Sequence, residues 1–173
     1  MAEPYITEQS FIARLNVLNT KYPGPVGRWE YSPGYNGSVH WHQSTWLTTS
    51  RQDREALKLW FGAVEYGDEG HVYEVRLWTG NSAGPMYNRR FDISSNGYLG
   101  LYEITPIVGP LWRMAHTDDG KVRMTNLDGK GVGVHWDKAA WSTGRMGSYL
   151  RLGAEPSALF DVDIVQMGIE EPL

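Results

Sequence analysis

Cysteine is absent from this sequence of 173 residues. Disulfide bonds, thiolate metal sites and cysteine nucleophiles are therefore excluded. Positive charge is also sparse, with 16 Lys and Arg against 20 Asp and Glu and no basic block. Binding to phosphate backbones needs clustered Lys and Arg, so we expect no nucleic-acid partner.

The sequence lacks an apolar run long enough to cross a bilayer, so no membrane span is expected. Residues 1–5 have neither the basic start nor the apolar stretch of a signal peptide. Together with the missing cysteines, this favours a cytoplasmic location and leaves export by a non-classical route open. The length fits one domain, residues 1–173.

Common catalytic motifs are missing as well. There is no Gly-x-Ser-x-Gly, no His-Glu-x-x-His and no Gly-Lys-Ser/Thr. The glycine-rich stretch 129–133 is not followed by a helical pattern that would bind phosphate. His40 and His42 share one face of a predicted strand, but the sequence assigns no third metal ligand. We therefore expect neither an enzyme nor a cofactor.

Aromatic residues and glycine are abundant, with 8 Trp, 10 Tyr and 20 Gly, and this is typical of turn-rich β structure. They fall into an internal repeat with copies at about 10–70, 71–119 and 120–168. Each copy begins with an apolar strand that carries an arginine, followed five residues later by a small polar residue in a predicted turn. The arginines are Arg14, Arg76 and Arg123, and the polar residues are Asn19, Asn81 and Asp128.

In each copy a second strand then carries an aromatic residue followed by an acid, and a turn comes after it. A third strand with alternating apolar residues follows, and a fourth strand carries Leu directly before an aromatic residue. The second-strand pairs are Trp29-Glu30, Phe91-Asp92 and Trp136-Asp137, and the turns are Asn36-Gly37, Asn96-Gly97 and Met146-Gly147. The third-strand core pairs are Val39/Trp41, Leu99/Leu101 and Leu150/Leu152, and the fourth-strand aromatics are Trp60, Trp112 and Phe160.

A unit of four short strands cannot bury its apolar face alone, whereas three units can close six strands into a barrel capped by three hairpins. From about 11 to 167 the chain resembles the β-trefoil superfamily, which implies an all-β fold of three pseudo-symmetric four-strand repeats. The Gln-x-Trp signature of ricin-B-like lectins is absent from the fourth strands. The resemblance is therefore one of architecture and matches no single family.

The β-trefoil superfamily includes lectins, protease inhibitors, growth factors and the binding modules of toxins, so the residues must decide between these functions. Sugars stack on aromatic rings and are held by carboxylates or amides. The predicted ligand-binding residues are the polar turn residues, the outward third-strand residues and the second-strand acids. They are Asn19, Asn81, Asp128, His42, Tyr102, Glu30, Asp92 and Asp137. Only the middle copy combines a polar turn residue with an outward ring.

Other interpretations of these residues remain open. The acids could lie beside core aromatics and pair with surface arginines, which stabilises little. The repeated arginines are expected to point outward or to bridge strands. The tryptophans at repeated positions, with Phe160, are assigned to the core, and the non-repeated Trp46, Trp78 and Trp141 to loops or the surface.

The leading hypothesis is a carbohydrate-binding protein whose partners are glycans or glycoproteins. Each of its sites would be shallow and bind weakly. Tight binding would require several sites at once or a homo-oligomer. One alternative is a protease inhibitor that acts through an inserted loop at 43–56, with a short helix at 50–57. Another is a binding subunit of a toxin or other assembly.

Overall fold

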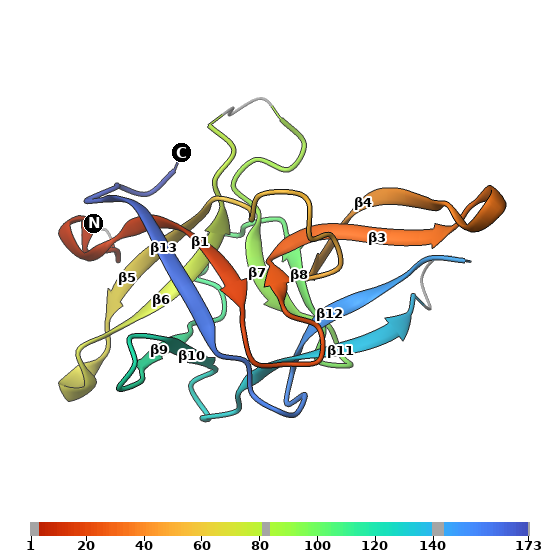
Figure 1. Cartoon of the computed structure of the whole chain (residues 1–173). Helices are drawn as coiled ribbons and strands as arrows, with labels where there is room; N and C mark the ends of the chain where they lie inside the picture. The colour runs from red at the N-terminus through yellow and green to blue at the C-terminus, as the bar shows by residue number, and fades with distance from the viewer. Residues whose placement is uncertain (1–3, 81–83, 140–143, 173) are drawn as a thin grey trace.

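The structure is a computed structural model that describes residues 4–80, 84–139 and 144–172, and it is all-β (Figure 1). Single 3-10 turns form at Thr7–Gln9, Tyr35–Gly37 and Gly67–Glu69. The strands are β1 (Phe11–Val17), β2 (Gly24–Pro25), β3 (Gly27–Pro33), β4 (Val39–Thr48), β5 (Leu59–Glu65), β6 (His71–Leu77), β7 (Arg90–Ile93), β8 (Leu99–Tyr102), β9 (Arg113–His116), β10 (Val122–Thr125), β11 (Val132–Lys138), β12 (Met146–Leu152) and β13 (Phe160–Met167).

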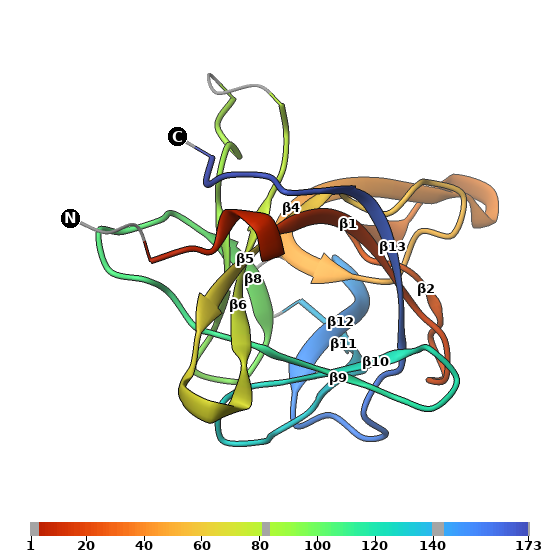
Figure 2. The same cartoon turned by 90° about the vertical axis from the view of Figure 1, so that its left-hand side faces the viewer.

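Among the described residues the strand pairings are antiparallel. The β3–β4, β7–β8 and β11–β12 hairpins each lie within one predicted repeat. Among the remaining strands, β1 pairs with β5 and β13, β5 with β6, β13 with β10, and β10 with β9. Backbone hydrogen bonds of 2.8 and 2.9 Å join Tyr73 of β6 to Trp112, just before β9. Figure 1 shows β3–β4 and β11–β12 on the right and β7–β8 near the centre, and Figure 2 turns β5, β6, β9 and β10 toward the viewer.

Each of the three predicted repeat ranges contains four strands of four or more residues, and every predicted strand overlaps or adjoins an observed one. The first repeat has the short β2 in addition, which pairs with β1. The predicted turn at Asn36-Gly37 lies between β3 and β4, and that at Asn96-Gly97 lies between β7 and β8. The predicted turn at Met146-Gly147 is wrong, because these residues already belong to β12 and the chain reverses before them.

The main hydrophobic core collects inward residues from all three repeats. The fourth-strand aromatics Trp60, Trp112 and Phe160 are fully buried, as predicted. The repeated tryptophans of the hairpins, Trp29, Trp41 and Trp136, are only half-buried, so their assignment to the core is wrong. At the position that Trp29 and Trp136 occupy in their repeats, the middle copy has Phe91, which is fully buried.

The first hairpin explains part of this difference. Strand β4 has ten residues, and the β3–β4 hairpin projects from the rest of the molecule (Figure 1). Val39 is 47% exposed, whereas Leu47, at the other end of the same strand, is fully buried. The prediction that Val39 faces the core is therefore wrong, because the hairpin carries it beyond the core.

The stretch predicted as an inserted loop, 43–56, is only partly a loop. Residues up to Thr48 belong to β4, where Trp46 pairs with Gly100 of β8. The remainder forms turns and not the predicted helix. Thr49 is buried, and its hydroxyl donates to the carbonyl of Tyr22 at 2.7 Å. Thr49 thus ties the start of this turn segment to the residues before β3, whereas residues 52–55 are exposed.

The three repeated arginines lie in different environments. Arg14 is half-buried and pairs with Glu55 at 3.6 Å, whereas Arg123 is exposed and donates to the carbonyl of Ser157 at 3.2 Å. Arg76 is only 4% exposed and belongs to a buried polar network. In the described part of the chain, no helix has the length and apolar character needed to cross a membrane.

Candidate functional site

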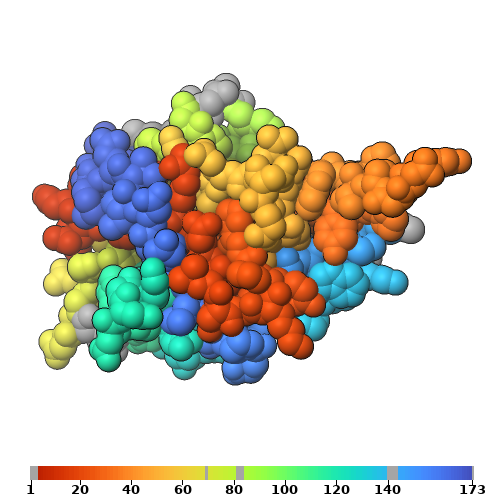
Figure 3. Space-filling view, in the orientation of Figure 1, coloured from red at the N-terminus to blue at the C-terminus, as the bar shows by residue number. Residues whose placement is uncertain are grey.

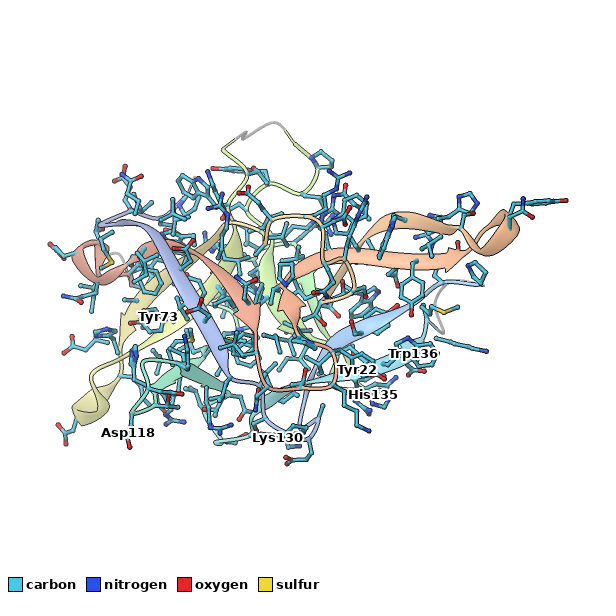
Figure 4. The ribbon with its side chains drawn as sticks, in the orientation of Figure 1. Tyr22, Tyr73, Asp118, Lys130, His135 and Trp136 are labelled. Carbon is cyan, nitrogen blue, oxygen red and sulfur yellow. The ribbon has the colours of Figure 1, made fainter. Side chains whose placement is uncertain are left out.

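An open cleft of about 590 Å³ lies where the segment before β3 meets the β11–β12 hairpin. Its aromatic lining comes from Tyr22 of that segment, Tyr31 of β3 and Trp136 of β11. Figure 4 shows Tyr22 and Trp136 near each other, and Figure 3 shows the orange-red surface of the early segment beside the light-blue surface of the third repeat. We call this the aromatic cleft.

Strand pairing brings these residues together from the first and third repeats. Met146 of β12 pairs with Tyr31, and Ser148 of the same strand pairs with Trp136. The two rings therefore lie on either side of β12, and the indole Nε1 of Trp136 donates to the Tyr31 hydroxyl at 2.8 Å. This bond fixes the orientation of one ring against the other.

Polar side chains line the rest of the aromatic cleft. The hydroxyl of Ser148 lies 2.9 Å from that of Thr49 and 3.3 Å from that of Ser50. Gln52 donates its Nε2 to the carbonyls of Pro23 and Thr49, both at 2.8 Å. The amide oxygen of Gln52 is thereby left as an acceptor, and the hydroxyls can donate or accept. Ring faces beside such groups suit a ligand with both apolar and hydroxyl surfaces.

A second pocket of about 260 Å³ adjoins the first. The two share Lys21, Tyr22 and Trp136, and the second adds His135 and Glu155. His135 and Glu155 are exposed, and Figure 4 places His135 beside Trp136. The aromatic residues thus form a wall common to two adjacent pockets.

More aromatic surface continues along the β3–β4 hairpin. Tyr31 and Trp41 are paired across the strands, with ring centroids 5.7 Å apart. The guanidinium of Arg51 lies 4.3 Å from the Trp29 ring centroid and 4.9 Å from that of Trp41. Such cation–π contacts hold the rings in place. The cleft therefore borders an ordered aromatic surface.

Glu30 was predicted as an exposed ligand contact, and the structure contradicts this. Its side chain is fully buried, and one carboxylate oxygen accepts a 2.5 Å hydrogen bond from the Tyr149 hydroxyl. The other oxygen lies 3.7 Å from the guanidinium of Arg145. Burial, together with the hydrogen bond to Glu30, raises the pKa of Tyr149. The alternation of β3 explains the result, because Trp29 and Tyr31 face outward and Glu30 faces inward.

Asp137 is also engaged in hydrogen bonds within the protein. It accepts a 2.7 Å hydrogen bond from the Tyr98 hydroxyl and a 2.8 Å bond from the Lys138 amide. The bond from Tyr98 is the main reason that the pKa of Asp137 lies below its usual value. Burial, aided by Asp137, raises the pKa of Tyr98 to about 12. The carboxylate joins β11 to the middle repeat.

Tyr98→Phe is expected to lower the free energy of unfolding by about 1 to 2 kcal/mol at neutral pH, since a hydrogen bond to a charged group is lost. Asp137 has a depressed pKa in the folded state, so this stabilisation is present above its unfolded pKa of about 3.9. It disappears as the pH falls through the folded-state pKa. Urea unfolding of the unchanged protein and of Tyr98→Phe, from pH 7 into acid, tests this. A difference in the free energy of unfolding that stays the same in acid would contradict it.

In the middle repeat, Asp92 and Tyr102 come close together. Burial, and then the charge of Asp92, raises the pKa of Tyr102. Asp92 accepts a 2.7 Å hydrogen bond from the Ile93 amide, and its other oxygen lies 3.8 Å from Arg90. The Tyr102 ring packs edge-on against Trp46, with centroids 6.3 Å apart. Asp92 and Tyr102 are partly accessible, and Asn81 lies outside the described residues.

The remaining predicted site residues lie apart from one another. Asn19 is exposed, but its side-chain amide is engaged on both sides. Its Nδ2 donates to the carbonyl of Ser157 at 3.2 Å, and its Oδ1 accepts from the backbone N–H of Leu159 at 2.6 Å. His42 is half-buried, with its Nε2 2.8 Å from the Ser32 hydroxyl. Asp128 is exposed in the turn between β10 and β11. These residues do not form a common site.

The sugar-binding residues predicted from the sequence did not include Tyr22, Tyr31 or Ser148, and Ser50 and Gln52 were predicted only as part of the 43–56 inhibitor loop. One signal was present: Trp29, Tyr31 and Trp41 crowd a single hairpin, which is more ring area than one repeat can bury. The contribution of Trp136 depends on contact between the first and third repeats, so no local motif marks it. Comparisons with protein-family models, curated proteins and solved structures found no match to this chain.

Proposed function

We propose that this protein is a lectin and that its fold is a β-trefoil. The pairing pattern supports the fold. In every repeat the second and third strands form a hairpin, and the first strand pairs with the fourth. Each fourth strand also pairs with the first strand of another repeat. Six strands related in this way form a barrel, and the hairpins cap it.

The aromatic cleft is the observation that carries the lectin proposal. Its volume, about 590 Å³, lies in the range of ligand pockets, roughly 300 to 1,000 Å³. The Tyr22 and Trp136 rings provide apolar faces for the C–H groups of a sugar. The hydroxyls of Ser50 and Ser148 and the amide of Gln52 provide the hydrogen bonds that sugar hydroxyls need.

Tyr22→Ala and Trp136→Ala are each expected to weaken glycan binding by about tenfold or more, because a stacking face is lost at the centre of the site. A glycan array identifies the bound sugars, and quenching of tryptophan fluorescence then measures affinity in solution. Tyr35→Ala is the matched control, since Tyr35 is 89% exposed at the tip of the β3–β4 hairpin, outside the cleft. It is expected to bind as the unchanged protein does.

The outcomes separate the sites. Trp136→Ala also removes the bond to Tyr31, so Tyr22→Ala is the cleaner variant for binding. Loss of binding in Tyr102→Ala, with Tyr22→Ala unaffected, would instead favour the middle repeat. A blank array with folded protein would overturn the lectin proposal.

A further inference from the structure

Two pockets with one shared wall suggest that the ligand is longer than a single sugar. The larger pocket is lined in addition by Tyr31, Ser50 and Gln52, and the smaller one by His135 and Glu155. Lys21, Tyr22 and Trp136 line both. A ligand that stacks on Trp136 in one pocket can therefore continue past the same ring into the other.

Close backbone packing creates the smaller pocket. A Cβ atom on Gly133 of β11 would lie 2.1 Å from the carbonyl oxygen of Ala154 and 2.8 Å from that of Pro156. Because glycine has no such atom, the segment before β13 lies directly against β11, with Gly133 bridged to Ser157. This packing brings Glu155 beside His135 and Trp136.

The charges of the smaller pocket indicate a neutral ligand. Glu155 is an exposed carboxylate, and Lys21 provides an ammonium group on the shared wall. These two charges balance, so the lining has no net positive charge that would favour uronic acids or sulfated sugars, and the carboxylate can accept hydrogen bonds from sugar hydroxyls. The net charge of −4 acts in the same direction.

We propose that the aromatic cleft and the smaller pocket are consecutive subsites for a neutral oligosaccharide of at least two units, with Trp136 between them. This proposal depends on the lectin function proposed above. Each added unit that reaches the second subsite gains contacts with His135 and Glu155. Affinity therefore rises with chain length until both subsites are filled.

The test measures calorimetric affinity for gluco-, galacto-, manno- and chito-oligosaccharides of one to four units, with uronic-acid oligosaccharides of the same lengths alongside. In the series that binds, the disaccharide is expected to bind at least about tenfold more tightly than the monosaccharide. In the double variant His135→Ala/Glu155→Gln, this gain falls to about twofold, while monosaccharide affinity stays the same. Asp128→Asn, at an exposed acid that lines neither pocket, is the control.

Each result that differs from these expectations overturns one specific part of the proposal. Equal affinity for one to four units, or a full gain in the double variant, overturns the two-subsite arrangement and leaves the lectin proposal intact. Tighter binding of the uronic-acid series overturns the neutral-ligand assignment. Binding to no carbohydrate of any length overturns the lectin proposal itself.

Discussion

Glu74→Ala is expected to lower the free energy of unfolding by about 3 to 5 kcal/mol, because it leaves a buried cation without its main partner. Glu74 is 1% exposed and Arg76 4% exposed, and their side chains are directly hydrogen-bonded. Burial alone would lower the pKa of Arg76, but the charge and hydrogen bond of Glu74 outweigh it and raise the pKa. Glu74 also accepts from the Gly109 amide at 2.6 Å, so that donor loses its acceptor too.

The network around Arg76 connects distant parts of the chain. Arg76 donates to the Tyr5 hydroxyl at 2.9 Å and to the Glu171 carboxylate at 2.8 Å. Asn88 donates to the carbonyl of Pro172 at 3.0 Å. Loss of Glu74 should therefore also loosen both end segments, which lie near each other in Figures 1 and 2.

Urea unfolding followed by circular dichroism measures the loss in Glu74→Ala. The double variant Glu74→Ala/Arg76→Met is the control, since it removes the buried charge as well as its partner. We expect the double variant to be more stable than Glu74→Ala alone. Equal stability of Glu74→Ala and the unchanged protein would contradict the assigned role of the pair.

Trp60→Ala is expected to lower the free energy of unfolding by about 3 to 5 kcal/mol, the usual range for removing a large buried ring. Trp60 is fully buried and lies edge-on to Tyr5, with ring centroids 5.0 Å apart. Its Nε1 donates to the carbonyl of Ile169 at 2.9 Å, so the substitution also leaves that acceptor without its partner. Thermal unfolding and urea titration check the size of the effect.

Gly62 provides a second test of the same packing. A Cβ atom there would lie 2.2 Å from Cη2 of Trp60, so Gly62→Ala should destabilise by about 1 to 3 kcal/mol through overpacking. Phenylalanine lacks the outer atoms of the indole. In a protein with Trp60→Phe, Gly62→Ala should therefore lower the free energy of unfolding much less than it does when Trp60 is present. Additive effects in this double-mutant cycle would rule out direct contact as the cause.

Several features of the architecture were predictable from local pattern. Period-2 alternation and turn residues located the strands, and the repeated Leu-aromatic pair identified Trp60, Trp112 and Phe160 as core. These signals are readable because each depends on residues close together in the chain.

Alternation does not reveal which face of a strand is covered, and this caused the errors at the hairpins. The acid after each second-strand aromatic was interpreted as outward, yet Glu30 is buried and Trp29 is half-exposed. In the middle repeat the order is reversed, with Phe91 buried. The same pattern thus has two outcomes. The pairing of β3 with β4 shifts register between Gly27 and Trp29, and a one-residue shift turns the side chains that follow to the other face.

Strand periodicity and turn chemistry are local properties, so residues close together in the chain were enough to predict an all-β fold. The proposed ligand site depends instead on long-range strand pairing. The aromatic cleft combines Tyr22 and Tyr31 of the first repeat with Trp136 of the third. These residues become neighbours because β12 pairs with β3 and β4, and such long-range pairing leaves no trace in the spacing of residues along the chain.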